Sequence, residues 1–225
     1  MTFIFKVAQG DLNFQANFPE PAFELFRDSL GLQRLLFTKL ARHRVQLTDI
    51  RVDPGNGTLG DYSLLSYLFN FSVSVRIRLE RVEIQSFDLA RVDVNKLNEA
   101  GVDVLEAIRS HVPSLSFKTH VLSVGLHGKL EGISVREFLS RFVTSGPKNL
   151  GPSIGNGAVF YFGPDAERLM SAVTTDLSSL IDGGLYVKLH VIWDASKVPI
   201  EGLPGVGDKY LRDALTQLDL AIEGV

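Results

Sequence analysis

Basic side chains recur on the polar sides of three segments that alternate apolar and polar residues, the pattern of half-buried strands. The polar positions carry Arg76, Arg78, His127, Lys129, Lys188 and His190. If the three strands share a sheet, its exposed face is basic and suits an anion, an acidic partner or a single-stranded nucleic acid. The alternative is that these charges only protect exposed strands from aggregation.

A glycine-rich segment at 146–157 adds Lys148 as a further candidate for contacting an anion or a partner. A phosphate-binding loop needs Gly-Lys followed by Ser or Thr, whereas here Gly151 precedes Pro152. Proline also removes a backbone donor where donors are needed. We therefore expect a connecting loop, with anion or partner binding as the alternative.

Metal and cofactor chemistry has no support in the sequence. None of the five histidines stands in a His-x-His or His-Glu-x-x-His spacing. His127 and His190 would share a metal only if their strands were neighbours. The absence of cysteine excludes thiol catalysis, zinc–thiolate sites and disulfides. We expect neither a metal nor a cofactor.

Catalytic motifs are missing too. The chain has no Gly-x-Ser-x-Gly elbow for a serine nucleophile. Carboxylate pairs such as Asp165 and Glu167 have no sequence reason to face each other across a cleft. The sequence therefore assigns no catalytic residue.

The composition is that of an ordinary folded protein. The 225 residues are 45% hydrophobic and 22% charged, which excludes a disordered chain. A net charge of −3 and a pI near 6.0 disfavour a dedicated nucleic-acid binder. No apolar run of about 18 residues predicts a membrane span, and the first residues do not resemble a signal peptide. We expect a cytoplasmic protein with no membrane partner.

The first part of the chain predicts a hairpin, a helix and a strand. Phe3 to Val7 and Leu12 to Phe18 alternate on either side of Gly10-Asp11, which indicates two strands joined by a turn. Apolar residues at helical spacing predict a helix over 21–43, bent at Gly31. Val45 to Val52 follows as a strand.

The clearest strand pattern runs from Tyr67 to Leu79, where every odd position is aromatic or aliphatic. One continuous strand with a buried odd face and a wet even face is expected, which is typical of antiparallel sheets. The apolar phase changes at Val82, so Glu80-Arg81 is predicted to be a turn or a bulge.

The remaining elements are a second helix, several strands and a terminal helix. Their expected ranges are a helix starting at Asp93 or Val94 and ending before Pro113, a strand over 116–130, a short helix capped by Ser134, strands over 159–162 and 185–193, and a helix over 207–222. The segment 166–181 fits either a helix or a strand, and we favour the strand.

Strands outnumber helices and few strand pairs flank a long helix. This order predicts an α+β fold with antiparallel sheets and helices packed on one face. We expect a single globular unit over 1–225. A duplication into two similar halves, with a boundary near 90–115, stays open because each half contains a helix followed by strands.

Two functions from different classes follow. The first is a non-enzymatic binding module that self-associates and binds a protein partner, because a wet sheet face offers surface and no catalytic constellation is found. The alternative is a small apolar-ligand binder, or an enzyme, with a cavity between sheet and helices; the 15 phenylalanines could line it or fill a core. A cavity above roughly 300 Å³ would favour the second.

Overall fold

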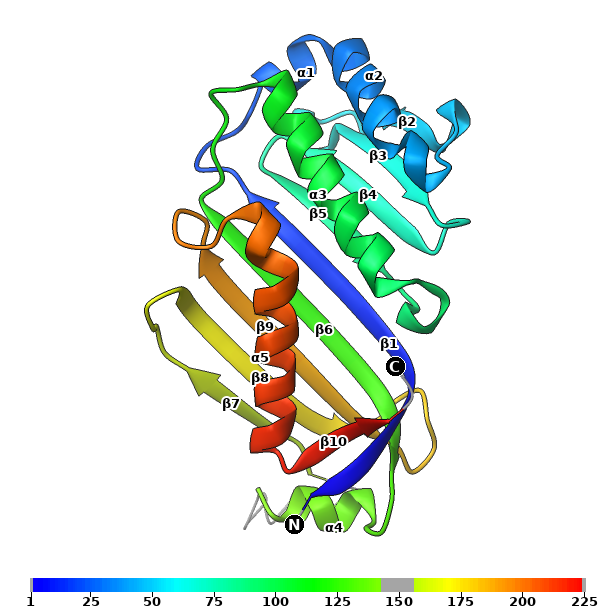
Figure 1. The fold of residues 1–225 in the computed structure, drawn as a ribbon, viewed down its shortest axis with the longest axis vertical. Helices are drawn as coiled ribbons and strands as arrows, with labels where there is room; N and C mark the ends of the chain where they lie inside the picture. Colours follow the sequence, from blue (N-terminus) through cyan, green and yellow to red (C-terminus); the bar gives the residue numbers. More distant parts are fainter. Residues whose placement is uncertain (1, 143–155, 224–225) are drawn as a thin grey trace.

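One large sheet organises the molecule (Figure 1). The computed structural model describes residues 2–142 and 156–223, and in these ranges ten strands form a sheet of order β2-β3-β4-β5-β1-β6-β9-β8-β7, with β10 also paired to β1. The strands are β1 (Phe3–Asn17), β2 (Ile50–Asp53), β3 (Ser63–Leu68), β4 (Val73–Arg78), β5 (Arg81–Ser86), β6 (Thr119–Leu130), β7 (Ala158–Phe162), β8 (Arg168–Leu177), β9 (Leu185–Asp194) and β10 (Leu220–Glu223). Every pairing is antiparallel except that of β1 with β10.

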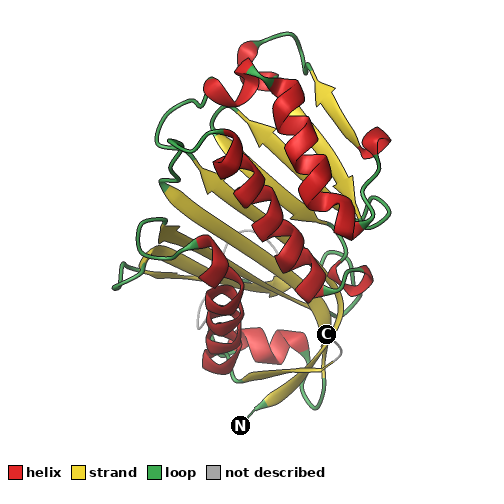
Figure 2. Cartoon of the chain, turned by 45° about the horizontal axis from the view of Figure 1, so that its top comes forward, coloured by secondary structure: helices red, strands yellow, loops and turns green. Residues whose placement is uncertain are grey.

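The long helices pack on one face of this sheet, called the helix face here; the opposite one is the open face (Figure 2). The helices are α1 (Glu24–Arg27), α2 (Ser29–Leu40), α3 (Val94–His111), α4 (Val135–Ser140) and α5 (Leu203–Gln217), and the short 3-10 turn η5 (Ile200–Gly202) precedes α5. Helices α2 and α3 cover the first half of the sheet and α5 the second (Figure 1). The predicted α+β class with an antiparallel sheet is confirmed.

Strand β1 is continuous, so the expected hairpin at Gly10-Asp11 is wrong. β1 pairs with β6 along most of its length, and the register shifts between Val7 and Gln9. A bulge inserts one residue and exchanges the two faces of a strand, which produces the same change of apolar phase as a turn. Asp11 therefore lies within the sheet, not at its edge.

The run from Tyr67 to Leu79 is also not one strand. Phe69, Asn70 and Phe71 all have positive φ, at 52°, 54° and 67°, and they turn the chain from β3 into β4. Val75 is buried as predicted, but Tyr67 pairs with Ser74 and therefore lies on the open face. The predicted turn before Arg81 is confirmed, since β4 and β5 pair across it.

Two helix predictions need correction at their ends. The helix expected over 21–43 is broken at Asp28, not bent at Gly31, because the Asp28 carboxylate accepts the Gly31 N–H at 2.9 Å and caps α2. The terminal helix ends at Gln217, and Ile222 belongs to β10.

Other local predictions are confirmed. Asp93 caps α3 by accepting the N–H groups of Asn95 and Lys96. Ser134 accepts the N–H of Glu137 at the start of α4. The ambiguous segment 166–181 contains strand β8, as favoured.

The order of elements repeats along the chain. Apart from β2 in the first half and β10 at the end of the second, the first half runs β1, α1–α2, β3, β4, β5, α3, and the second runs β6, α4, β7, β8, β9, α5. β1 and β6 lie side by side at the centre, with β5 on the outer side of β1 and β9 on the outer side of β6. This order is compatible with a duplication whose boundary falls near α3, which stays a prediction.

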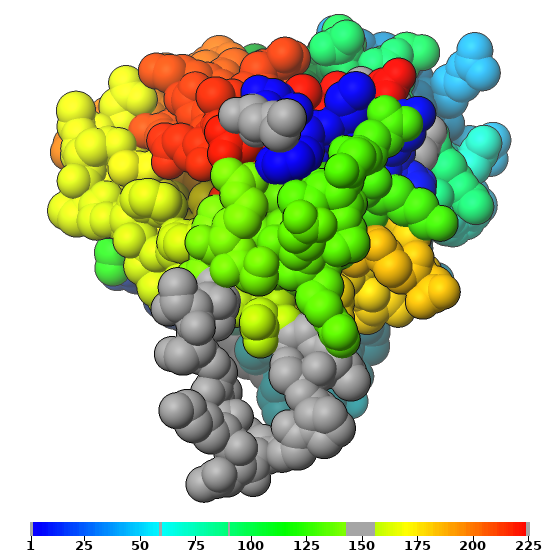
Figure 3. All heavy atoms as spheres, turned by 90° about the horizontal axis from the view of Figure 1, so that it is seen from below, coloured from blue at the N-terminus to red at the C-terminus, as the bar shows by residue number. Residues whose placement is uncertain are grey.

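The chain ends and the β6–α4 segment meet at one end of the molecule (Figure 3). Phe3 of β1 contacts Phe138 of α4, and β10 pairs with the first residues of β1. No helix in the described ranges has both the length and the apolar character needed to cross a membrane.

Candidate functional site

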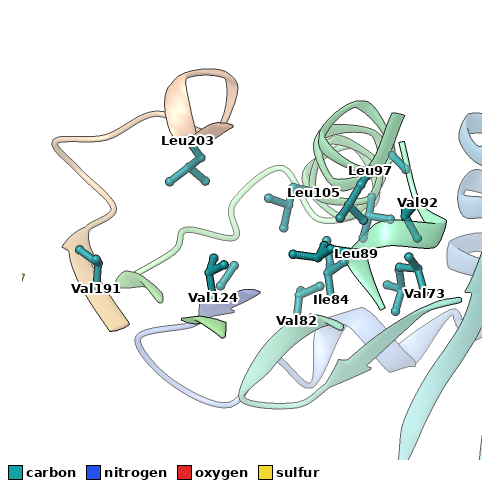
Figure 4. Packing of buried hydrophobic residues seen from close by; sticks show 14 of the residues in the cluster. Val73, Val82, Ile84, Leu89, Val92, Leu97, Leu105, Val124, Val191 and Leu203 are labelled. Atoms are coloured by element: carbon teal, nitrogen blue, oxygen red, sulfur yellow. The ribbon is translucent and has the colours of Figure 1, made fainter. Parts of the chain in front are cut away.

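An apolar groove of about 1140 Å³ lies on the helix face between α3 and α5. Leu97 and Leu105 of α3 form one wall, and Leu211 and Leu215 of α5 form the other. The floor consists of side chains from the central strands, namely Leu12, Phe14, Ile84, Leu122, Val124 and Leu126. Figure 4 shows Leu105 and Leu203 on opposite sides of a space above Val124.

The groove exists because α3 and α5 pack against the sheet without closing over its centre. Helix α3 packs mainly against α2, on the side away from α5. As a result, Leu12, Phe14 and Leu122 are only half-buried although they lie on the two central strands. Apolar side chains in the middle of a covered sheet face are normally fully buried.

Glycines on both helices widen this space. Gly101 of α3 lines the groove, and a Cβ at this position would make only an ordinary contact, 3.4 Å from Ile84 Cδ1. Gly205 of α5 also lines it, and a Cβ added there would have no heavy atom within 4 Å. Gly207 instead allows α5 to approach β6, since a Cβ there would lie 2.9 Å from Leu122 Cδ2.

The two ends of the groove differ. At one end, η5 packs against α3, and the lining residues Ile200 and Leu203 are apolar. At the other end, the start of α3 and the last turns of α5 lie near β10 (Figure 1). The polar lining residues are Thr2, Asn95, Asn98, Asp208, Arg212 and Thr216. Arg212 Nε donates a hydrogen bond to the Asp208 carboxylate at 2.8 Å. The groove is thus apolar along its length and polar at one end.

Two buried nitrogens lie near the apolar end without a hydrogen-bond partner among the described residues. Trp193 lines the groove and is 1% exposed, and its indole Nε1 is unpaired. His120, the cross-strand neighbour of Trp193, has an unpaired Nδ1. Burial lowers the pKa of His120 to about 4, so this side chain is neutral at pH 7.

The predicted basic residues lie on the open face, away from the groove. Arg76 and Arg78 belong to β4, where each has a carboxylate nearby: Arg76 lies 3.4 Å from Asp53, and Arg78 lies 3.6 Å from Glu83. These arginines therefore belong to a mixed, partly neutralised surface.

The other predicted residues lie on β6 and β9, separated from β4 by β5 and β1. Lys129 is exposed and pairs in register with Lys6, whereas Lys188 lies near Asp11. Burial raises the pKa of Asp11, while the charges of His127 and Lys188 oppose that shift. The structure thus places the six residues on one sheet face without bringing them into one cluster. Lys148 lies outside the described residues.

The two histidines of the open face, His127 and His190, are each hydrogen-bonded to a serine, and the two imidazoles do not lie together. His127 Nδ1 lies 2.9 Å from Ser178 Oγ, and His190 Nδ1 lies 2.8 Å from Ser123 Oγ. Their strands are neighbours, but His190 pairs with Ser123 and His127 with Tyr186, so the imidazoles are not adjacent. No group of three potential metal ligands occurs within 2–142 and 156–223.

Sequence reasoning named a cavity between sheet and helices but none of its residues. The glycines of α3 and α5, Gly101 and Gly205, were the available signal, because glycine inside a helix is costly and often has a packing reason. The alternation predicts floor residues such as Leu122 and Val124 on an inward strand face, but no local pattern shows that α3 and α5 leave part of this face uncovered.

Comparisons with known proteins assign no family to the chain. No model of a known protein family matches it, and no curated protein matches it. Among solved structures, Ara h 8.0201 matches with 14% sequence identity over 93% of this chain and 94% of that chain, at a TM-score of 0.18. A likeness at this TM-score supports no conclusion about fold or function.

Proposed function

We propose that this protein binds an amphipathic small molecule in the groove between α3 and α5. The observation that supports this most is a groove of about 1140 Å³ whose apolar floor includes three half-buried side chains of the two central strands, Leu12, Phe14 and Leu122. Ligand pockets commonly measure about 300–1000 Å³ and are lined mainly by apolar residues. This groove is large enough for a long acyl chain or a comparably sized hydrocarbon.

The difference between the two ends suggests how such a ligand would lie. Its apolar body would occupy the end near Leu203 and Trp193, where burial of hydrocarbon is favoured by about 25 cal/mol per Å². Its polar head would face Asn95, Asn98 and Arg212, whose amide and guanidinium groups donate hydrogen bonds. Arg212 is already paired with Asp208, so a head group with hydrogen-bond acceptors fits these donors without needing a negative charge.

Titration with cis-parinaric acid, a fluorescent C18 polyene carboxylate, tests this proposal. We expect saturable binding of one molecule per chain, with quenching of Trp193, the single tryptophan of the chain. Gly101→Phe should fill the groove from α3 and weaken binding at least tenfold. Leu211→Arg should do the same from the α5 wall.

Matched variants separate blocking of the groove from unfolding. Gly101→Ala adds one methyl group in ordinary contact with Ile84, so it should fold, gain up to about 1 kcal/mol of stability and keep its affinity. Gly163→Phe places the same large side chain at an exposed position with open space around it. Unchanged affinity in Gly101→Phe and Leu211→Arg, or no binding by the wild-type protein, would overturn the proposal.

A further inference from the structure

In the part of the chain that the structure describes, the outer edge of β7 ends the sheet without a strand partner. β7 pairs with β8, and no other backbone hydrogen bond of Ala158–Phe162 occurs within the described residues. An edge strand presents a row of N–H and C=O groups that can pair with another strand. The complementary ligand of such an edge is therefore a further extended strand.

The two edges of this sheet differ in how they are protected. β2, at the other edge, has four residues and includes Arg51 and Asp53, and short charged edge strands resist pairing. β7 has the sequence Ala-Val-Phe-Tyr-Phe and contains no charge. Val159 and Tyr161 are 48% and 74% exposed on its open face. Of these two edge strands, β7 is the one without a charged side chain to oppose edge-to-edge association.

The β7 edge is also complementary to itself. In an antiparallel pair of two copies centred on Phe160, Val159 of one copy lies opposite Tyr161 of the other, and this contact occurs twice by symmetry. Pairs of aromatic and β-branched residues stabilise antiparallel strands. Ala158 and Phe162 meet in the same way on the helix face, and no like charges face each other.

We propose that two copies of this chain form a symmetric dimer by antiparallel pairing of their β7 edges, which joins the two sheets into one. The β7 edge is separated from β6 by β9 and β8, so this dimerisation is independent of ligand binding in the groove. The dimer interface is then Ala158–Phe162 of each copy, paired in the register centred on Phe160.

Sedimentation velocity of the full chain over a range of concentrations tests the dimer. We expect the wild-type protein to approach the dimer mass as its concentration rises. The double variant Val159→Lys/Tyr161→Lys places lysine opposite lysine twice across the interface. It should raise the dimer dissociation constant at least tenfold, because like charges on directly opposed residues repel.

A charge-swapped variant tests the register. Val159→Glu/Tyr161→Lys changes the same two exposed side chains but places a glutamate opposite a lysine twice in the proposed pairing, so the dimer should be retained. Val52→Lys, on the β2 edge, should leave the dimer unchanged. A monomeric wild-type protein, or equal dissociation constants for the two double variants, would overturn the proposal, and melting temperatures identify any variant that fails to fold.

Discussion

At the scale of single residues, His120 couples the stability of the fold to pH. It is 1% exposed, stacks on Phe14 at 5.9 Å, and burial lowers its pKa from 6.5 to about 4. The unfolded chain therefore binds more protons than the folded chain between these two pH values. The contribution of His120 is fully present above about pH 6.5 and is lost as the pH falls toward 4, a difference of about 3 kcal/mol.

We expect His120→Leu to reduce the loss of stability between pH 6.5 and 4.5. The variant removes an unpaired buried nitrogen and keeps an apolar side chain of similar size. Urea unfolding at a series of pH values measures the effect as the difference from the wild-type protein. An unchanged slope in His120→Leu would contradict the assignment.

At the scale of elements, neighbouring residues of strand β4 point to opposite faces of the sheet. Val75 is 1% exposed on the helix face, whereas Ser74 lies half-buried on the open face. We expect Val75→Asp to cost several kcal/mol, because it buries a carboxylate without a partner, against a total stability of about 5–15 kcal/mol. Ser74→Asp should cost no more than about 1 kcal/mol. Equal urea midpoints for the two variants would disprove this orientation of β4.

At the scale of the whole molecule, the long pairing of β1 with β6 joins the two halves of the sheet. The register runs from Phe5 and Leu130 to Asn17 and Thr119. Because α3 and α5 do not meet over most of their length, this pairing and that of β1 with β10 are the main connections between the halves, with a smaller contact between α3 and η5. Separation would leave a long central strand edge and the groove floor exposed in each half.

We therefore expect the halves to unfold together in one cooperative transition. Trp193 fluorescence reports on the second half, since it is the single tryptophan of the chain, whereas circular dichroism reports on the helices of both halves, of which α2 and α3 of the first half contribute the larger part. The two signals should give the same urea midpoint. Separate midpoints would indicate two independently stable units instead.

Several features follow from the sequence because their causes are local. The cap at Asp93, the alternation in β9 and the change of phase before Arg81 each depend on neighbouring residues, and the structure agrees at all three places. The α+β class follows in turn from the order of such elements. The placement of Arg76 and Lys188 on polar strand faces has the same origin, since alternation determines the side to which each residue points.

The tertiary structure decided what depends on distant parts of the chain. A bulge between Val7 and Gln9 and a turn produce the same periodicity, and only pairing with β6 distinguishes them. The turn at Phe69–Phe71 has positive φ at three consecutive residues without glycine, and Asn70 is the single residue of a type that favours this region. The alternation of apolar residues continues through the turn and conceals it. The groove depends on the separation of two helices about 100 residues apart, which packing against a shared sheet sets and no local pattern encodes.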